Sequence, residues 1–232
     1  MKQFRFGILG AGGIAHKFCN AVGKVDDACV AAVASKDQKR AWRFAKRHGI
    51  EDFYSDYEHL LAREDIDAIY IATTHNFHYE NIIACLEHNK PVLCEKSMVP
   101  TAAQAQEIFS LAKEKKLFVM EAMWSRFLPH INQARQWIKE GRIGNLEAAT
   151  CTIGFSASRD PAHRINNPVL GGGAAYDIGV YAIELTTYLI DEPVIDVQSI
   201  LTRSETGVDK TDSILLRFPS CTANLQATTA AT

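Results

Sequence analysis

The chain has 232 residues, enough for one large domain or two modest ones, and its 47% hydrophobic and 22% charged residues are typical of a globular protein. Its 25 Lys and Arg against 27 Asp and Glu give a net charge of −2, which points to neither a nucleic-acid nor an anionic-membrane partner. Charges break every apolar run well short of the roughly 18 residues that span a bilayer, and no signal-peptide pattern is present. The six cysteines are scattered without a C-x-x-C pair. We therefore expect a soluble, cytoplasmic protein without structural zinc or a disulfide framework.

Roughly the first 120 residues alternate short apolar runs with helical patterns. Residues 4–9, 29–34, 68–72, 91–94 and 117–120 predict strands. Helices are predicted at about residues 14–22, 38–48, 79–88 and 101–116, the last beginning at a Thr101-x-x-Gln104 pattern with capping-box spacing. Repeated βα units of this length predict a doubly wound parallel sheet with right-handed crossovers.

The pattern changes near Met123. A helix is predicted over residues 129–140 and another at about 174–189, with strands over 146–155, 195–202, 213–218 and 222–228. We expect an α/β fold of two domains. A dinucleotide-binding Rossmann domain would cover residues 1–122, and an α/β domain with a mostly antiparallel open sheet would cover residues 123–232.

A glycine-rich loop connects the first predicted strand to the first predicted helix. The residues that match G-x-G-x-x-A, with two neighbours, are Gly10, Gly12, Gly13, Ile14 and Ala15. Gly10 would permit the tight turn, Gly12 the approach of a pyrophosphate, and Ala15 close packing of helix on sheet. The diphosphate would then lie on the N-H groups of the helix N-terminus. The alternatives are a glycine turn in an unrelated α/β protein and a methyltransferase-type loop.

The end of the second predicted strand indicates which dinucleotide binds. An NAD site usually has an acidic residue here to accept the ribose hydroxyls, whereas this chain has Ser35 and Lys36, with Arg40 close behind. A hydroxyl and cations suit a 2′-phosphate, so we favour NADP(H), with NAD(H) possible because Asp37 follows Lys36. Asp37 has the alternative role of capping the next helix.

The loop after the strand at 68–72 holds Thr73, His75 and His78. Ligands bind where parallel strands end, so these residues are candidates to border the nicotinamide ribose. The alternative is a structural role, with Asn76 as a helix cap and His78 as a packed histidine. No carboxylate or cysteine accompanies the two histidines at ligand spacing, so we expect no metal site.

Four motifs together resemble the Gfo/Idh/MocA oxidoreductases. They are the glycine loop, Cys94-Glu95-Lys96, the segment 121–127 with Trp124 and Arg126, and the segment 171–181 with Asp177 and Tyr181. The chain is most similar to the dihydrodiol dehydrogenase and glucose-fructose oxidoreductase branch. The resemblance implies hydride exchange between NAD(P) and a sugar, polyol or diol, or the corresponding ketone or aldehyde, with a Rossmann domain preceding an α/β domain.

The resemblance also implies roles for individual residues. Lys96, Asp177 and Tyr181 match catalytic positions, and Asp177 and Tyr181 would also contact substrate. Removing a hydroxyl proton during hydride transfer requires such groups. Lysine and tyrosine usually have a pKa near ~10; a neighbouring positive charge would lower the pKa of both, and burial would lower that of lysine. Which of Lys96 and Tyr181 holds the proton is open. Asp177 and Tyr181 lie four residues apart, which places them on one face of a helix.

Further residues complete the expected site. Trp124, Arg126, Glu95 and Lys96 would border the cofactor, and Arg164 would reach a substrate oxygen. Five of the expected site residues also have an ordinary alternative. Lys96 and Arg164 would be surface residues, Tyr181 a core tyrosine, Asp177 an acid at a helix N-terminus, and Glu95 a structural residue.

The chain departs from the family pattern in two respects. Ser97 follows the Glu-Lys pair where the family usually has proline, and the chain is shorter than family members, so we expect an incomplete second sheet. We expect a small-molecule substrate and a homodimer or larger oligomer formed through that sheet. The alternative function is a non-catalytic NAD(P)-binding regulator or assembly subunit on the same fold.

Overall fold

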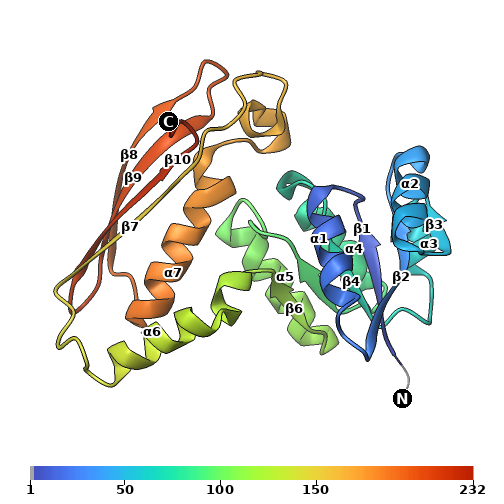
Figure 1. Cartoon of the computed structure of the whole chain (residues 1–232), viewed down its shortest axis with the longest axis horizontal. Coiled ribbons are helices and arrows are strands. Elements are labelled where there is room, and N and C mark those ends of the chain that lie inside the picture. The colour runs from blue at the N-terminus through green and yellow to red at the C-terminus, as the bar shows by residue number, and fades with distance from the viewer. Residues whose placement is uncertain (1–2, 232) are drawn as a thin grey trace. The chain divides into compact units, whose positions relative to one another are not determined.

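The computed structural model describes residues 3–231 and divides into two compact units, Met1–Ala122 and Met123–Thr232. Each unit is built around its own sheet (Figure 1). The strands of the first unit are β1 (Phe4–Leu9), β2 (Ala28–Ala34), β3 (Asp52–Tyr54), β4 (Ala68–Ile71), β5 (Val92–Cys94) and β6 (Val119–Glu121). Its helices are α1 (Gly13–Val22), α2 (Gln38–His48), α3 (Tyr57–Leu61), α4 (His78–Glu87) and α5 (Ala102–Lys115), with a 3-10 turn at His75–Phe77.

The six strands of the first unit pair in parallel in the order β3-β2-β1-β4-β5-β6. Helices cover both faces, so successive strand residues enter different cores. Ile8 packs with residues of α1 and α2, whereas Leu9 packs with residues of α3, α4 and α5. Burial on both faces explains why these strands appear in the sequence as continuous apolar runs. The predicted doubly wound sheet is confirmed.

Local signals set most element boundaries in this unit. Thr101 accepts a hydrogen bond from the Gln104 N-H at 3.3 Å and so caps α5, as its spacing predicts. Strand β3 and helix α3 are not among the predicted elements. They have three and five residues, too few for a hydrophobic period to stand out, and tertiary pairing with β2 decides them.

The second unit consists of one four-stranded sheet and two main helices. Its strands are β7 (Ala148–Gly154), β8 (Asp196–Arg203), β9 (Asp209–Arg217) and β10 (Thr222–Thr228). Its helical segments are α6 (Pro129–Lys139), α7 (Val180–Ile190), a π-helical turn at Ala175–Gly179, and 3-10 turns at Trp124–Phe127, Arg164–Asn166 and Pro168–Leu170.

The sheet order is β7-β10-β9-β8. The β9 pairs are antiparallel and the β10–β7 pair is parallel, so the expected mostly antiparallel sheet is confirmed. Helix α7 covers the face of β7 and β10, where Ala182 and Ile190 pack against Leu225 (Figure 1). Every residue of β8 is exposed, including Ile200.

The helix predicted at about residues 174–189 does not begin as a regular α-helix. Residues Ala175–Gly179 form a π-helical turn before α7 starts at Val180. Asp177 lies in the π turn and Tyr181 in the first α turn, so their four-residue spacing does not have regular α-helical geometry. Within residues 3–231, no helix combines the length and the apolar character needed to cross a membrane.

Candidate active site

The predicted site residues of the first unit follow the carboxyl ends of four neighbouring strands. Ser35 follows β2, Gly10 follows β1, Thr73 comes shortly after β4, and Lys96 shortly after β5. Because the strand order is β2-β1-β4-β5 and neighbouring strands lie about 4.8 Å apart, this row is roughly 15 Å long. The row lies at the edge of the sheet where parallel α/β folds bind ligands.

The glycine loop at the centre of the row has the geometry of a phosphate-binding turn. Gly10 has φ of +97°, and a Cβ there would lie 2.8 Å from the carbonyl oxygen of Ala72. Gly12 is the N-cap of α1 and provides no side-chain cap, and a Cβ on Gly13 would meet no described atom within 4 Å. Ala15 is fully buried. The first N-H groups of α1 therefore open onto space that suits an anionic group.

Asp37, beside the expected ribose position, caps a helix. Its carboxylate accepts a hydrogen bond from the Arg40 N-H at 3.1 Å, and this bond is the main reason that its pKa is lowered. The Ser35 side chain is buried, and its hydroxyl accepts from the Asp37 N-H at 3.4 Å. Lys36 lies 5.2 Å from the centre of the Phe77 ring with most of its side chain exposed, and Arg40 is exposed. The exposed Glu80 carboxylate lies 4.0 Å from the Lys36 ammonium group.

His78 connects the ends of β4 and β5. It is buried, with Nδ1 2.9 Å from the Ser97 carbonyl oxygen and Nε2 3.1 Å from the Thr73 carbonyl oxygen. Burial is the main cause that lowers its pKa, and a neutral imidazole has one N-H to donate. The ring therefore donates to one of these two carbonyls and packs against the other. His78 is a packed histidine that supports the backbone beside Lys96.

Two glutamates hold the strand ends on either side of Lys96. Glu121 accepts a hydrogen bond from the Met98 N-H at 2.7 Å. Glu95 accepts one from the hydroxyl of Tyr70, and burial raises the pKa of the Glu95 carboxyl. The Lys96–Ser97 peptide bond is cis. The backbone at Lys96 is thus fixed by side chains from three other elements, although Ser97 replaces the usual proline.

In the second unit, Asp177 and Arg164 form an ion pair. Asp177 is buried in the π turn, and one of its oxygens lies 2.8 Å from Nη2 of the half-exposed Arg164. Two residues expected to contact substrate are therefore brought together. Their partnership fixes the carboxylate of Asp177 and leaves part of the guanidinium exposed.

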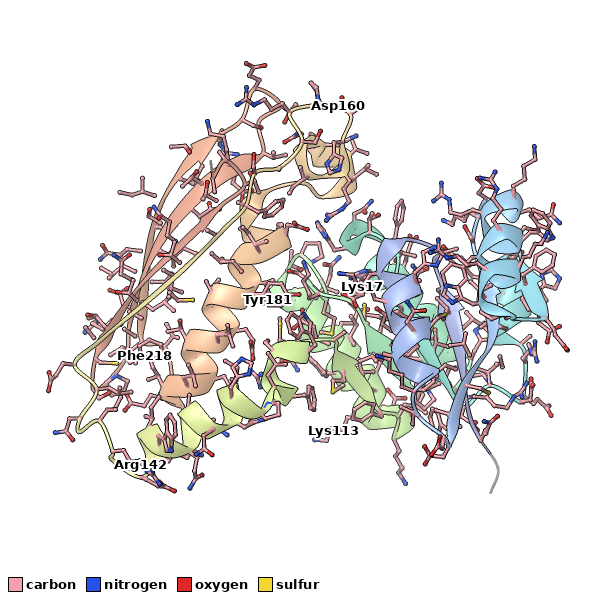
Figure 2. The ribbon with its side chains drawn as sticks, viewed as in Figure 1. Lys17, Lys113, Arg142, Asp160, Tyr181 and Phe218 are labelled. Atoms are coloured by element: carbon pink, nitrogen blue, oxygen red, sulfur yellow. The ribbon has the colours of Figure 1, made fainter. Side chains whose placement is uncertain are left out.

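Tyr181 projects from the first turn of α7 (Figure 2). Its hydroxyl oxygen accepts a hydrogen bond from the indole N-H of Trp124 at 2.9 Å, and the two rings pack edge to face. Arg126 instead forms a 2.5 Å ion pair with the buried Glu184, which also accepts from the hydroxyl of Ser125. Trp124 thus contacts Tyr181, whereas Arg126 anchors its segment to α7.

Sequence reasoning missed Glu121, Glu184 and Tyr70 as supporting residues. Glu121 follows a predicted strand, so its place at the carboxyl edge was a usable signal. Glu184 and Tyr70 lie among apolar residues and had no comparable signal. No group of three or more metal-ligand side chains occurs in the described part of the chain.

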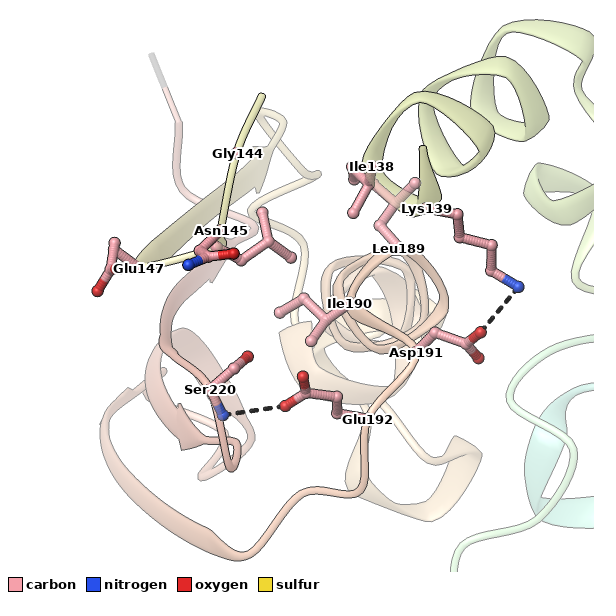
Figure 3. Close-up of a pocket in the computed structure, with 11 residues that line it drawn as sticks. Ile138, Lys139, Gly144, Asn145, Glu147, Leu189, Ile190, Asp191, Glu192 and Ser220 are labelled. Carbon is pink, nitrogen blue, oxygen red and sulfur yellow. Dashed lines mark hydrogen bonds and ion pairs between the residues drawn. The ribbon is translucent and has the colours of Figure 1, made fainter. Parts of the chain in front are cut away.

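A separate cavity of about 400 Å³ lies in the second unit, where α6 and α7 end (Figure 3). Its charged groups are mostly paired. Lys139 lies 3.0 Å from Asp191, and Glu192 accepts from the Ser220 N-H at 3.0 Å. None of the predicted catalytic or cofactor residues is among the described residues that line it. We assign this cavity no role.

Comparison with known proteins matches both units to one family. Residues 4–123 match the profile described as "Oxidoreductase family, NAD-binding Rossmann fold", and residues 131–232 match the GFO/IDH/MocA C-terminal domain. Trans-1,2-dihydrobenzene-1,2-diol dehydrogenase of Mus musculus is 36% identical over 218 residues, covering 93% of this chain and 65% of its own. D-xylose 1-dehydrogenase (NADP(+)) of Hypocrea jecorina is 35% identical over 242 residues, covering 93% and 62%. The chain therefore spans less than two thirds of these relatives' length.

Solved structures show the same fold. A 3-ketoreductase from Actinomadura kijaniata, in complex with NADP and TDP-benzene, is 29% identical with a TM-score of 0.90, covering 99% of this chain and 71% of its own. The aldose-aldose oxidoreductase of Caulobacter crescentus has a TM-score of 0.92 at 23% identity, covering 100% and 72%. At 23% identity, the similarity to the Caulobacter crescentus enzyme shows only that the two chains share a fold.

Proposed function

Because the chain belongs to the Gfo/Idh/MocA family of oxidoreductases, we propose that it transfers a hydride between NADP(H) and a small sugar, polyol or diol, or the corresponding carbonyl compound. The observation that carries the proposal is the row of residues at one edge of the first sheet. An open phosphate-binding turn at Gly10–Gly13 and Lys96 follow strands that are two positions apart in that sheet.

The residues at this edge fit a dinucleotide. Gly10 and Gly12 keep side chains away from the α1 N-terminus, whose N-H groups would hold the diphosphate. The adenosine end would then lie toward Ser35 and the nicotinamide end toward Lys96, because these residues follow strands on opposite sides of β1. When bound, the nicotinamide supplies or accepts the hydride.

NADP(H) is the proposed preference over NAD(H). Asp37 is engaged as the cap of α2, so it is a poor acceptor for ribose hydroxyls. Lys36 and Arg40 are exposed cations close to the same strand end, and both would form charge-assisted hydrogen bonds with a 2′-phosphate. The related xylose dehydrogenase from Hypocrea jecorina carries NADP(+) in its name.

Lys96 is proposed as a catalytic residue because its backbone is held at the edge where the nicotinamide would lie. Its ammonium group would stabilise negative charge that develops on the substrate oxygen, or give that oxygen a proton. The contact of His78 with the Ser97 carbonyl and the hydrogen bond from Met98 to Glu121 restrain the flanking backbone, so they are proposed to limit the directions in which the lysine points.

Tyr181 and Asp177 are proposed as the second half of the catalytic set. The Tyr181 hydroxyl, fixed by Trp124, would exchange a proton with the substrate oxygen. Asp177 and Arg164 form an ion pair with each other. The guanidinium N-H groups and the carboxylate lone pairs that this ion pair does not use would bind and orient substrate hydroxyls.

The test is NADPH and NADH consumption against a panel of aldoses, ketoses, dicarbonyls and diols. Lys96→Met is expected to lower kcat about 100- to 10,000-fold while the Kd for NADPH stays within a factor of two or so. Lys113→Met, on the exposed face of α5, is the matched control and should behave like wild type. A Lys96→Met enzyme with the wild-type rate would refute the assignment. NADPH binding without turnover of any compound would instead favour the regulator function.

The proposal also includes the cellular compartment and the oligomeric state. We expect the activity in the cytoplasm and a homodimer or larger oligomer formed through the second sheet, whose edge strand β8 exposes Val197 and Ile200. Sedimentation of a monomer at micromolar concentration would contradict the oligomer without affecting the catalytic assignment.

A further inference from the structure

A bulge in strand β9 brings two aspartates to the same face of the second sheet. Thr211 pairs with Thr202 of β8, whereas Asp209 pairs with Arg203, so Lys210 is an extra residue on β9. Side chains normally alternate along a strand, so residues three apart face opposite sides of the sheet. Because Lys210 is an extra residue, Asp209 and Asp212 instead face the same side. On that side, a hydrogen bond with Asp209 is among the causes that raise the pKa of Asp212.

Asp209 contacts the beginning of the helical segment that contains Asp177 and Tyr181. Its Oδ2 accepts a hydrogen bond from the Ala175 N-H at 2.6 Å. A Cβ on Gly173, where φ is +132°, would lie 2.1 Å from Oδ1 of Asp209. Only glycine fits there, so the conformation of the glycine segment and the position of the carboxyl group depend on each other.

Asp212 is buried beside this contact. It is 5% exposed, and its Oδ2 has no hydrogen-bond donor among the residues that the structure describes. An ionised carboxylate in that position would face a second carboxylate with no donor between them, which is unfavourable. A protonated Asp212 would instead supply the missing donor and give its hydrogen bond to Asp209.

We propose that Asp209 and Asp212 share one proton, and that this acid–carboxylate pair is the positioning element for the turn that carries Asp177 and Tyr181. The pair presents a single negative charge to the N-terminal N-H groups of the segment, which the dipole of the helix favours. The positioning role rests on the proposed function, whereas the shared proton does not.

The surroundings of the pair are consistent with a carboxyl group that ionises late. Burial, followed by the neighbouring Asp209, raises the pKa of Asp212 to about 7. The charged or titratable groups on adjacent elements are Tyr176 and Asp177 in the π turn, Asp196 and Arg203 on β8, Lys210 and Arg217 on β9 and Cys151 on β7, while β10 has none. Asp177 pairs with Arg164, and Arg203 donates to the Gly207 carbonyl. No cation of the described residues forms an ion pair with Asp212.

The shared proton is tested by the pH dependence of thermal unfolding. In the unfolded chain an aspartate has a pKa of about 3.9. Between about 3.9 and 7 the folded chain therefore retains a proton that the unfolded chain has released, so stability falls as pH rises through this window and levels off above it. Asp212→Asn keeps a donor toward Asp209 at every pH and removes this loss.

The Tm of Asp212→Asn minus that of wild type is expected to rise by several degrees from pH 5 to pH 8. Asp196→Asn, on the exposed edge strand β8, is the control and should give a difference that does not vary with pH. Parallel curves for Asp212→Asn and wild type would overturn the shared proton. If the variant does not fold, carboxyl ¹³C chemical shifts of aspartate-labelled wild type decide the point. One aspartate should titrate near pH 7, and the absence of any that titrates above pH 5.5 would overturn the proposal.

The positioning role is tested separately with Asp209. Asp209→Ala should accelerate amide hydrogen exchange at residues 174–181 and lower kcat about tenfold, with no change in the Kd for NADPH. Asp209→Asn retains an oxygen for the Ala175 N-H and should restore most of both. Unchanged exchange in Asp209→Ala would overturn the positioning role. If wild type turns over no compound, the proposed function fails, while the exchange and Tm results still decide the structural claims.

Discussion

Replacing Gly10 by alanine tests the close approach of the β1 turn to the chain after β4. Two effects oppose the new methyl group. A non-glycine residue at φ of +97° costs roughly 1–3 kcal/mol in backbone strain. The methyl would also lie 2.8 Å from the Ala72 carbonyl carbon and oxygen, and overpacking of this kind costs roughly 1–3 kcal/mol. The expected loss is therefore about 2–6 kcal/mol, or roughly 5–20 °C in Tm for a chain of this size.

Two other glycines separate the contributions. Gly49 has φ of +67° but open space around its Cβ position, so Gly49→Ala carries the strain alone, about 1–2 kcal/mol. Gly13 has open space and lies at the first position of α1, so Gly13→Ala should be neutral or should stabilise by up to ~1 kcal/mol.

The assay is thermal unfolding without cofactor, followed by far-ultraviolet circular dichroism. From highest to lowest Tm, the expected order is Gly13→Ala, wild type, Gly49→Ala and then Gly10→Ala. If Gly10→Ala melted at or above Gly49→Ala, the predicted contact with the Ala72 peptide would be wrong, and with it the argument that only glycine fits this turn.

Three further outcomes follow from the site. Arg40→Glu should raise the KM for NADPH at least tenfold and leave the KM for NADH nearly unchanged, because it reverses an exposed charge near the proposed 2′-phosphate. Arg43→Glu on the same helix is the control. Equal effects of Arg40→Glu on both cofactors would contradict the assignment. His78→Leu should lower kcat more than it raises the KM for NADPH, because it removes support from the backbone beside Lys96; a normal kcat in a folded variant would contradict that role. Glu184→Leu should destabilise the chain by about 2–4 kcal/mol in urea unfolding, because it leaves two donors without their acceptor; a loss below ~0.5 kcal/mol would show that the ion pair contributes little.

Local chemistry made much of the first unit predictable. The apolar runs and helical periods gave the parallel sheet, because strands buried on both faces must be almost wholly apolar. The Thr101–Gln104 cap is a contact between residues three apart and so is visible in the sequence. For the same reason the glycine turn was recognisable, since Gly10 needs a conformation that other residues avoid.

Other features could not be decided from the sequence. Asp37 had two alternative roles there, as a helix cap and as a cofactor contact, and the structure shows the cap, with a hydrogen bond from the Arg40 N-H. The π turn around Asp177 and the ion pair between Asp177 and Arg164 had no local signal that distinguished them from a regular helix and a surface arginine.

The sequence by itself determined the family motifs, the order of the elements and the residue types that the proposed chemistry needs. Only the tertiary structure decided which polar groups meet. The contacts of His78 with Ser97 and of Glu121 with Met98, beside Lys96, span 19 and 23 residues, and the contact of Asp209 with Ala175 spans 34. The physical reason is that periodicity and capping record interactions within a few residues, whereas strand order and one bulged residue set which distant side chains share a face.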